Sequence, residues 1–222
     1  MMPKTALLLW CLSFSLALDA VAAPTKTPLK VYDVDPFLSR ASVAVKYTFG
    51  TYLIPNTDVR GQMELHPTQV LSGVRVGFGI QGFKSGNKTL DCHLRESLGL
   101  NYSKSEFPDR HVCENDLLPS RGVNSVIYPE IAFQSEDSNL DLTKVAELPV
   151  EIEVNGIWRL HGIEKTNKVK LTVQRQGDGI LVRGKKTFSL RDYDVTVKKF
   201  LFISVHDEVH AEWELHLQPE KP

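Results

Sequence analysis

The clearest pattern in the chain is an alternation of apolar and polar residues that begins at Val150. Apolar side chains occupy every second position from Val150 to Val154 and return at Trp158 and Leu160. A period of two is typical of a strand with one buried and one solvated face. The alternation resumes over residues 169–173, so the stretch predicts an antiparallel hairpin whose turn lies at the polar residues 164–167.

Other stretches carry similar strand signals, and each would present one apolar face. These are residues 43–49, 59–65, 74–80, 131–135, 180–190 and 208–217. Such strands can bury that face, without leaving an unpaired edge, by closing into a barrel. With about eight strands and no internal repeat, the sequence predicts an all-β fold made of a single eight-stranded antiparallel barrel.

The strand pattern is lost between Ser85 and Tyr128. Leu90, Leu94 and Leu98 recur there at helical spacing behind Asn87, a residue type that caps helix N-termini. We therefore expect a short helix over one mouth of the barrel. The following residues, 101–126, are rich in Ser, Asn, Asp and Pro and predict an irregular excursion.

Composition fits one large all-β domain and argues against a polyanionic partner. The chain has 222 residues, of which 42% are apolar and 24% are charged, as in ordinary globular proteins. It carries 26 basic and 27 acidic residues, so no net field attracts nucleic acid or an anionic surface.

The first 22 residues resemble an export signal. Lys4 precedes an apolar run over residues 6–18, and Ala20-Val21-Ala22 forms a small-residue cleavage site. The apolar run is shorter than the roughly 20 residues that span a bilayer. We expect cleavage after Ala22, which leaves residues 23–222 as an exported barrel domain and not an integral membrane protein.

Removal of this signal leaves two cysteines, Cys92 and Cys113. In an oxidising compartment the first expectation is a disulfide between them. It would close a loop of about 22 residues and contribute roughly 3 kcal/mol on the chain-entropy model. Two free buried thiols, or half of a metal site, are the alternatives.

Several motifs, in this order, resemble the YceI-like family of lipid- or polyisoprenoid-binding proteins. They are residues 32–36 (YDVDP), 86–95 (GNKTLDCHLR), 128–135 (YPEIAFQS), 155–165 (NGIWRLHGIEK), 189–194 (SLRDYD) and 207–209 (DEV). The resemblance implies a lipocalin-like barrel that holds a long apolar chain and is exported to the periplasm or secreted. The stretch from Glu96 to Ile127 is longer than is common in that family and carries Cys113. This irregular insertion, residues 85–128, is expected at one barrel mouth, pinned by the disulfide.

Residues on the inward faces and on the helix are the candidate ligand-binding set. They are Tyr47, Phe49, Val76, Phe78, Ile80, Leu94, Leu98, Phe133, Trp158, Leu160, Lys186, Phe188, Leu190 and Trp213. The alternative is that these side chains fill the barrel as a solid core. Lys186 falls on the same alternate positions as the apolar residues of its strand. It therefore either faces a polar ligand head near the rim or marks a bulge that flips the register.

Catalytic patterns are weak. The sequence has no Gly-x-Ser-x-Gly, His-Glu-x-x-His or phosphate-loop motif, so an enzyme is not expected. The alternating residues His210, Glu212, Glu214 and His216 are either a solvated strand face or a surface metal site, and we expect the former.

These observations predict an exported carrier of a long-chain amphiphile, such as a polyisoprenoid, an isoprenoid quinone, a fatty acid or a fatty amide. The alternative is a stress-response or protein-interaction module on the same barrel without a lipid. Neither reading requires a cofactor or a metal beyond the bound lipid. The oligomeric state is left open, a homodimer included.

Overall fold

The structure is a computed structural model that describes residues 29–66, 70–101, 104, 121–122, 124–135, 140–141, 149–196 and 204–220. The predicted signal peptide, residues 1–22, and Cys113 lie outside this set. The strands are β1 (Lys30–Val34), β2 (Arg40–Tyr47), β3 (Gly50–Asn56), β4 (Val59–Leu65), β5 (Val70–Gly79), β6 (Glu130–Ser135), β7 (Leu140–Asp141), β8 (Val150–Leu160), β9 (Ile163–Gln176), β10 (Gly179–Ser189) and β11 (Val205–Pro219). The helices are η1 (Ile80–Gly82), α1 (Lys88–Gly99) and η3 (Arg191–Tyr193).

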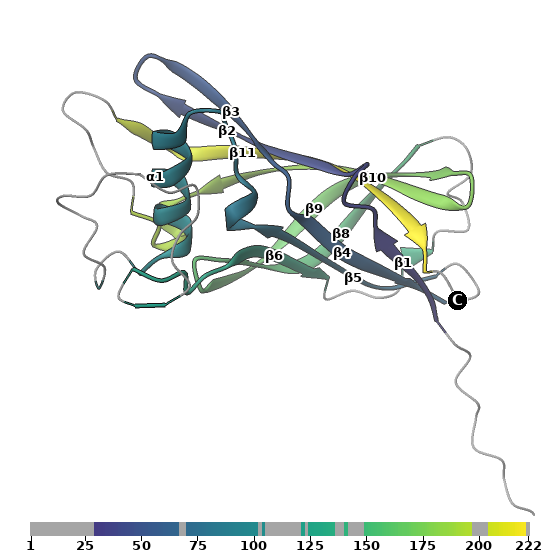
Figure 1. Cartoon of the computed structure of the whole chain (residues 1–222). Coiled ribbons are helices and arrows are strands. Elements are labelled where there is room, and N and C mark those ends of the chain that lie inside the picture. The colour runs from purple at the N-terminus through teal and green to yellow at the C-terminus, as the bar shows by residue number, and fades with distance from the viewer. Residues whose placement is uncertain are drawn as a thin grey trace, which may run out of the picture.

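Eight of these strands close into an antiparallel barrel in the order β1, β4, β5, β6, β8, β9, β10, β11. Closure comes from β1, which pairs with β4 through Tyr32 and Met63 and with β11 through Val34 and Leu217. The barrel is elongated, with α1 across one end and β1 near the other (Figure 1). The predicted all-β, eight-stranded barrel with one short helix is therefore confirmed.

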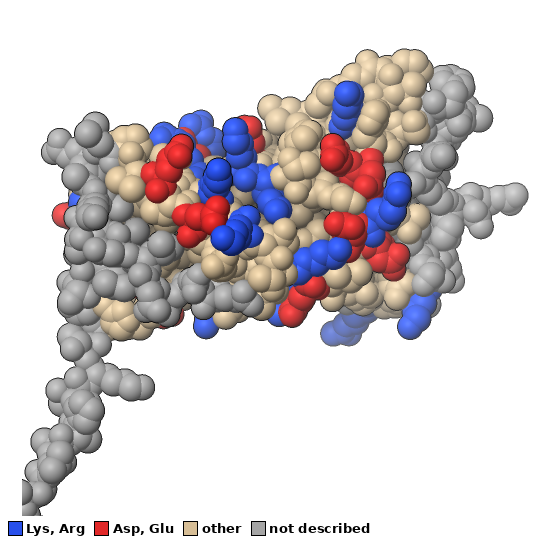
Figure 2. Space-filling model, turned by 180° about the vertical axis from the view of Figure 1, so that it is seen from behind, with Lys and Arg blue, Asp and Glu red and all other residues tan. Residues whose placement is uncertain are grey.

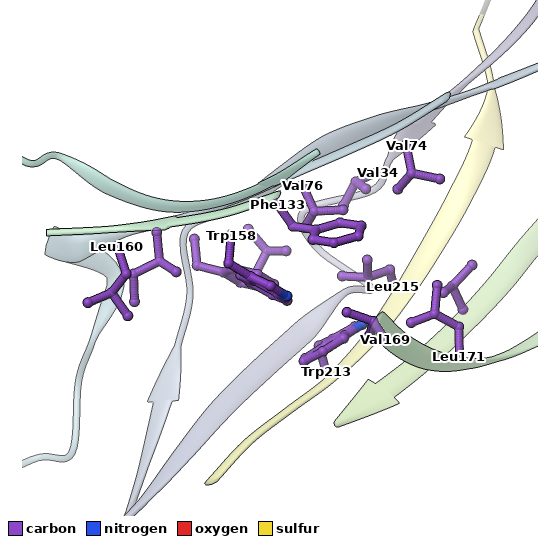
Figure 3. Packing of buried hydrophobic residues seen from close by; sticks show 14 of the residues in the cluster. Val34, Val74, Val76, Phe133, Trp158, Leu160, Val169, Leu171, Trp213 and Leu215 are labelled. Atoms are coloured by element: carbon purple, nitrogen blue, oxygen red, sulfur yellow. The ribbon is translucent and has the colours of Figure 1, made fainter. Parts of the chain in front are cut away.

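The alternation in the sequence becomes an inner and an outer face. Along β11, Val209, Trp213 and Leu215 are buried, while His210 and Glu212 between them are exposed. The inward side chains of all eight strands form one continuous core (Figure 3). Burial of each large apolar side chain contributes about 1.5–3 kcal/mol, so this face supplies the main driving force for closure.

The β2–β3 hairpin lies outside the closed ring. The first predicted strand, residues 43–49, is therefore not a barrel strand along its whole length. β2 ends at Tyr47, and the chain turns at residues 48–49 into β3, although β3 contains Pro55 and proline usually interrupts a strand. Apart from the bridge between Asn56 and Phe83, β3 pairs only with β2 in the described chain, and an edge strand tolerates a proline. Phe49 is 64% exposed in the turn, so its predicted inward orientation is wrong.

The β8–β9 hairpin is confirmed, but its turn was misplaced. β8 and β9 pair continuously from Val150↔Val173 to Leu160↔Ile163, with His161 and Gly162 between them. Both turn residues have positive φ, 52° and 78°, which is the combination a type I′ turn requires. The polar residues 164–167 belong to β9 instead.

Helix α1 is confirmed at the predicted position. The Asn87 side-chain oxygen accepts a hydrogen bond from the Leu90 amide at 3.1 Å, which caps the first turn. Leu98 is buried against the core, and the helix ends at its C-cap residue Leu100. Of the excursion at residues 101–126, only 101, 104, 121–122 and 124–126 are described. The short strand β7 pairs with β5.

The outer surface mixes both signs of charge. On the face shown in Figure 2, Lys and Arg side chains are interspersed with Asp and Glu. Such a surface provides no single-sign patch on this face for a polyanion. Among the described residues, no helix combines the length and apolar character needed to cross a bilayer.

Candidate ligand-binding site

The middle of the barrel holds a cluster of aromatic rings centred on Trp158. Its ring centroid lies 5.0 Å from those of Phe133 and Phe188, 5.7 Å from that of Trp213 and 6.4 Å from that of Phe78. These side chains come from five strands, β8, β6, β10, β11 and β5, and Figure 3 shows Trp158, Phe133 and Trp213 within the shared interior. Tilted and edge-on arrangements of this kind are favourable for aromatic pairs.

Two glycines make room for these rings. A Cβ atom on Gly156 would lie 2.4 Å from the Phe133 ring, and one on Gly184 would lie 2.4 Å from the Trp213 indole. Both distances are far below van der Waals contact, so neither strand could carry a larger residue without moving a ring. The glycines therefore shape the interior as directly as the aromatic residues do.

Most of the predicted site residues lie together in this interior. Those buried in the core are Val76, Phe78, Ile80, Leu98, Phe133, Trp158, Leu160, Phe188, Leu190 and Trp213. Leu94 of α1 is half-buried against them. Phe49 and Tyr47 lie apart, because both contribute to the β2–β3 hairpin, where the Tyr47 ring stacks on Tyr52 at 4.6 Å.

The structure resolves the two readings of Lys186. β10 pairs with β11 without a bulge from Ile180↔Leu217 to Ser189↔Glu208, so the register does not flip. Lys186 therefore belongs to the inner face, between Gly184 and Phe188. Its Nζ atom donates a hydrogen bond to Asn167 Oδ1 of β9 at 2.9 Å.

Several interior residues were not assigned to the site from sequence. Tyr193 of η3 is buried, and its ring lies 6.0 Å from that of Phe188. Burial raises the pKa of the Tyr193 phenol, and the Asp192 carboxylate raises it further. Asn167 was missed because it was placed in a turn. Counting every second residue of β9 back from the buried Val169 places Asn167 on the inner face, and this alternation could have identified Asn167 from the sequence.

The interior also contains polar atoms that have no partner in the described chain. Trp158 Nε1 and Tyr32 Oη are buried and have no hydrogen-bond partner among the described residues. Buried polar groups are nearly always hydrogen-bonded in proteins. Trp158 Nε1 can only donate, so it favours a ligand or water that brings an acceptor into the apolar interior.

The rim beneath α1 is held by polar contacts. Lys165 Nζ lies 3.4 Å from Asp192 Oδ2 and 5.6 Å from the centre of the Tyr193 ring. The two ring nitrogens of His161 lie 2.8 Å and 3.2 Å from the carbonyl oxygens of Leu100 and Tyr193. These contacts connect the β8–β9 turn with the end of the helix and with η3.

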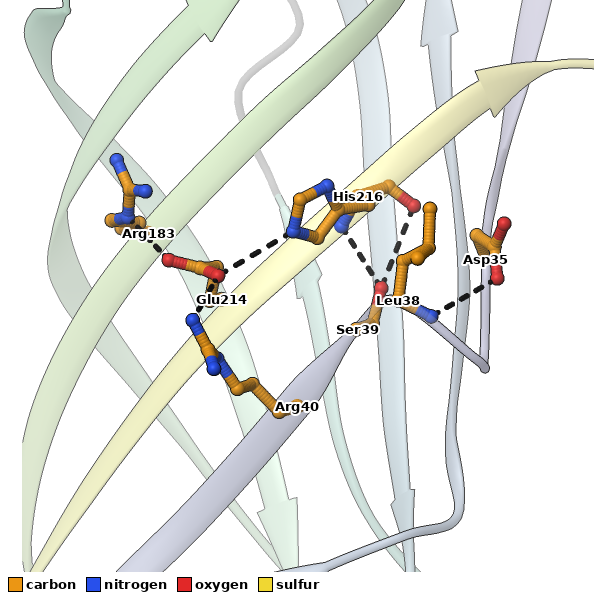
Figure 4. Close-up of polar contacts among 7 residues, drawn as sticks. All are labelled: Asp35, Leu38, Ser39, Arg40, Arg183, Glu214 and His216. Carbon is orange, nitrogen blue, oxygen red and sulfur yellow. Dashed lines mark hydrogen bonds and ion pairs between the residues drawn. The ribbon is translucent and has the colours of Figure 1, made fainter. Parts of the chain in front are cut away.

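A second cluster of polar side chains lies on the outer face of β11 (Figure 4). Glu214 lies 2.6 Å from Arg183 Nε and 2.7 Å from Arg40 Nη2, and His216 Nε2 is 3.4 Å away. The hydrogen bond from Arg183 is the largest cause that lowers the pKa of Glu214 to about 2, and Arg40 and His216 add to it against the opposing effect of desolvation. In the described part of the chain, no group of three or more His, Cys, Asp or Glu residues could hold a metal.

A closed barrel with an apolar, aromatic interior and few polar atoms has the architecture of a protein that binds an apolar small molecule. The chain belongs to the YceI-like family, whose domain model matches residues 32–217. The predicted family is therefore confirmed over nearly all of the described chain.

Two solved structures support the same fold. A polyisoprenoid-binding domain from Saccharophagus degradans, implicated in plant cell wall breakdown, superposes with a TM-score of 0.59 at 14% identity and covers 85% of this chain and 98% of its own. BcnA from Burkholderia cenocepacia superposes with a TM-score of 0.57 at 16% identity and covers 83% and 99%. A comparison with curated proteins finds no match.

Proposed function

We propose that this protein is an exported carrier that holds a long-chain amphiphile in the barrel interior. The observation that carries the proposal is the continuous apolar inner face, which joins the Trp158 cluster to the rim beneath α1. Family membership supports it, as does the polyisoprenoid-binding relative. The candidate ligands are polyisoprenoids, isoprenoid quinones, fatty acids and fatty amides, and export rests on the signal-like residues 1–22.

Affinity would follow the apolar area that the ligand withdraws from water. Each buried methylene contributes about 0.8 kcal/mol before the cost of ordering the chain is subtracted. Because the rings around Trp158 contact one another, a chain that runs among them has to shift some of them. Ligand binding would therefore change the environment of Trp158 and Trp213 directly.

The same interior argues for binding over catalysis. The residues around Trp158 are aromatic or aliphatic, and the nearby interior groups that can titrate, among the described residues, are Lys165, Lys186 and Tyr193. General acid and base catalysis needs a donor and an acceptor beside the reacting atom. We therefore propose that the protein binds its ligand without chemical change.

A second candidate function is favoured by the β2–β3 hairpin. Phe49 and Leu53 are 64% and 66% exposed there, beside the edge of β3. Exposed apolar residues on a strand edge are typical of protein-interaction surfaces. A protein-interaction or stress-response module would use this hairpin and leave the barrel interior as a solid core.

Mass spectrometry of an organic extract of the purified protein tests the first proposal. It should reveal a copurifying long-chain amphiphile, and titration of delipidated protein should change tryptophan emission and raise the melting temperature. If chains from about ten carbons to polyprenyl length change neither signal, the interaction module is the better account.

Two pairs of variants locate the site. Phe78→Glu and Trp158→Glu should abolish ligand retention, because an inward carboxylate has to stay charged against apolar walls or take up a proton. His210→Ala and Glu212→Ala change exposed residues of β11 and should retain the ligand. Lipid content is measured per folded molecule, and circular dichroism checks that each variant is folded. A folded Trp158→Glu protein that still carries ligand would place the binding surface outside the barrel.

A further inference from the structure

In the described part of the barrel wall, strand pairing is interrupted between β9 and β10. Their pairing runs from Gln176↔Gly179 only to Leu171↔Gly184. β9 nevertheless stays paired with β8 as far as Ile163, and β10 stays paired with β11 as far as Ser189. Toward the rim beneath α1, main-chain hydrogen bonds therefore do not join these two neighbouring strands.

Two side chains bridge this discontinuity. Lys186 of β10 and Asn167 of β9 are both half-buried, and the Lys186 Nζ to Asn167 Oδ1 hydrogen bond measures 2.9 Å. Asn167 Nδ2 in turn donates to the carbonyl oxygen of Lys165 at 3.3 Å. The amide therefore holds the ammonium at the inner face of the wall.

Among the described residues, no acid matches the charge of Lys186. An ammonium has three N–H donors, and within the described chain Asn167 Oδ1 is the one acceptor that Lys186 has. Lys165 differs, because it lies 3.4 Å from Asp192. A half-buried cation with only a neutral partner is costly, and a bound anion would offset that cost.

The surrounding inner face contains donors and almost no acidic groups. Along the described inner faces of β8 to β11 the one carboxylate is Asp207, and it already accepts hydrogen bonds from Ser189 Oγ at 2.6 Å and from the Arg191 amide at 2.8 Å. Trp158 Nε1 adds a buried donor that no described residue satisfies, and the Trp158 ring lies 5.0 Å from that of Phe188, the next inner-face residue after Lys186.

We propose that Lys186 binds an oxyanion headgroup, a carboxylate or a phosphate monoester, at the discontinuity between β9 and β10. Asn167 is a positioning residue that holds the ammonium, and the alkyl chain extends from there toward Trp158. This inference rests on the proposed carrier function. It narrows the ligand from any long-chain amphiphile to an acidic one.

A series of probes with one chain and different headgroups tests the proposal. Dodecanoate, dodecyl phosphate, dodecanol and dodecyltrimethylammonium are titrated below their micelle concentrations into the delipidated full-length protein, with tryptophan emission as the readout. At least one acid should bind about tenfold more tightly than dodecanol, because a charge-assisted hydrogen bond is added to the same chain contacts. A preference for dodecanoate alone, or for dodecyl phosphate alone, identifies which oxyanion the site takes.

Variants at neighbouring positions separate the outcomes. Lys186→Met should lower the acid preference over dodecanol to about twofold, whereas Lys186→Arg and the exposed control Lys185→Met should keep the preference. Equal binding of acids and dodecanol to the wild-type protein, or an acid preference that survives Lys186→Met, overturns this inference alone. Failure of all four probes to bind contradicts the carrier function itself. The wild-type series decides the matter even if Lys186→Met does not fold.

Discussion

His161 Nε2 lies 2.8 Å from the carbonyl oxygen of Leu100, the residue that ends α1. Its Nδ1 lies 3.2 Å from the carbonyl oxygen of Tyr193, and its ring meets the Tyr128 ring edge-on at 4.5 Å. A neutral imidazole donates to one of the two carbonyls at a time, whereas an imidazolium donates to both. One side chain in the β8–β9 turn thus fastens the helix at the barrel mouth to the rim.

We predict that His161→Asn loosens α1. Asparagine tolerates the positive φ at this position but is too short to reach both carbonyls. The loss should lower the free energy of unfolding by about 1 kcal/mol and weaken hydrogen-exchange protection at the end of the helix. Urea unfolding and hydrogen exchange measure these effects. His210→Asn on the exposed face of β11 is the control, and equal exchange in α1 for both variants would contradict the proposed fastening.

Gly184 gives a packing prediction. A side chain there meets the Trp213 indole, so Gly184→Val should destabilise the protein by about 1–3 kcal/mol and alter tryptophan emission. Gly73→Val on β5 is the matched control, because a Cβ there has only an ordinary contact of 3.9 Å to Glu64. The control should change stability by no more than about 0.5 kcal/mol. A similar loss for both variants would mean that strand glycines are generally required and that room for Trp213 is not the cause.

The Cys92–Cys113 disulfide stays a prediction, since Cys113 lies outside the described residues. Cys92 itself is buried in α1. Protein from an oxidising compartment should contain no free thiol, and intact mass before and after alkylation tests this. Two alkylated cysteines in unreduced, unfolded protein would show that the excursion at the mouth is not clamped.

The overall fold was predictable because burial on one face leaves a period-two pattern in each strand. β11 shows this most clearly, since its alternation from Val209 to Leu217 corresponds directly to the inner and outer faces. Local signals also sufficed for α1, where Asn87 and the leucine spacing marked the start and the buried side. These features depend on neighbouring residues alone.

Features that depend on distant partners were missed or left open. Pro55 indicates a break, but at a sheet edge its missing N–H costs little, so β3 forms. Polar residues after Glu164 indicated a turn, although His161-Gly162 was the stronger turn signal. Lys186 could not be oriented until its register with β11 was known, and its contact with Asn167 exists because β9 and β10 lie side by side.

Glu214 provides the pH prediction. Its pKa falls from 4.5 to about 2 in the folded protein, chiefly because Arg183 donates a hydrogen bond to it. A carboxyl group whose pKa is lower in the folded state than in the unfolded state stabilises the fold above the unfolded value. That contribution is lost as the pH falls from about 4.5 to about 2.

Glu214→Gln should therefore lower the free energy of unfolding at neutral pH and have a diminishing effect in acid. Glu214 itself is only 17% exposed, but its partners Arg40 and Arg183 are 77% and 49% exposed. Solvent screening then limits the effect to about 1–2 kcal/mol. Urea titrations at pH values from 7 down to about 2.5 should show the wild-type and variant curves converging. Glu212→Gln, on the exposed face of the same strand, should leave the wild-type pH dependence intact. If the difference in free energy of unfolding between wild type and Glu214→Gln stays constant across this range, the ion pair with Arg183 does not stabilise the folded state.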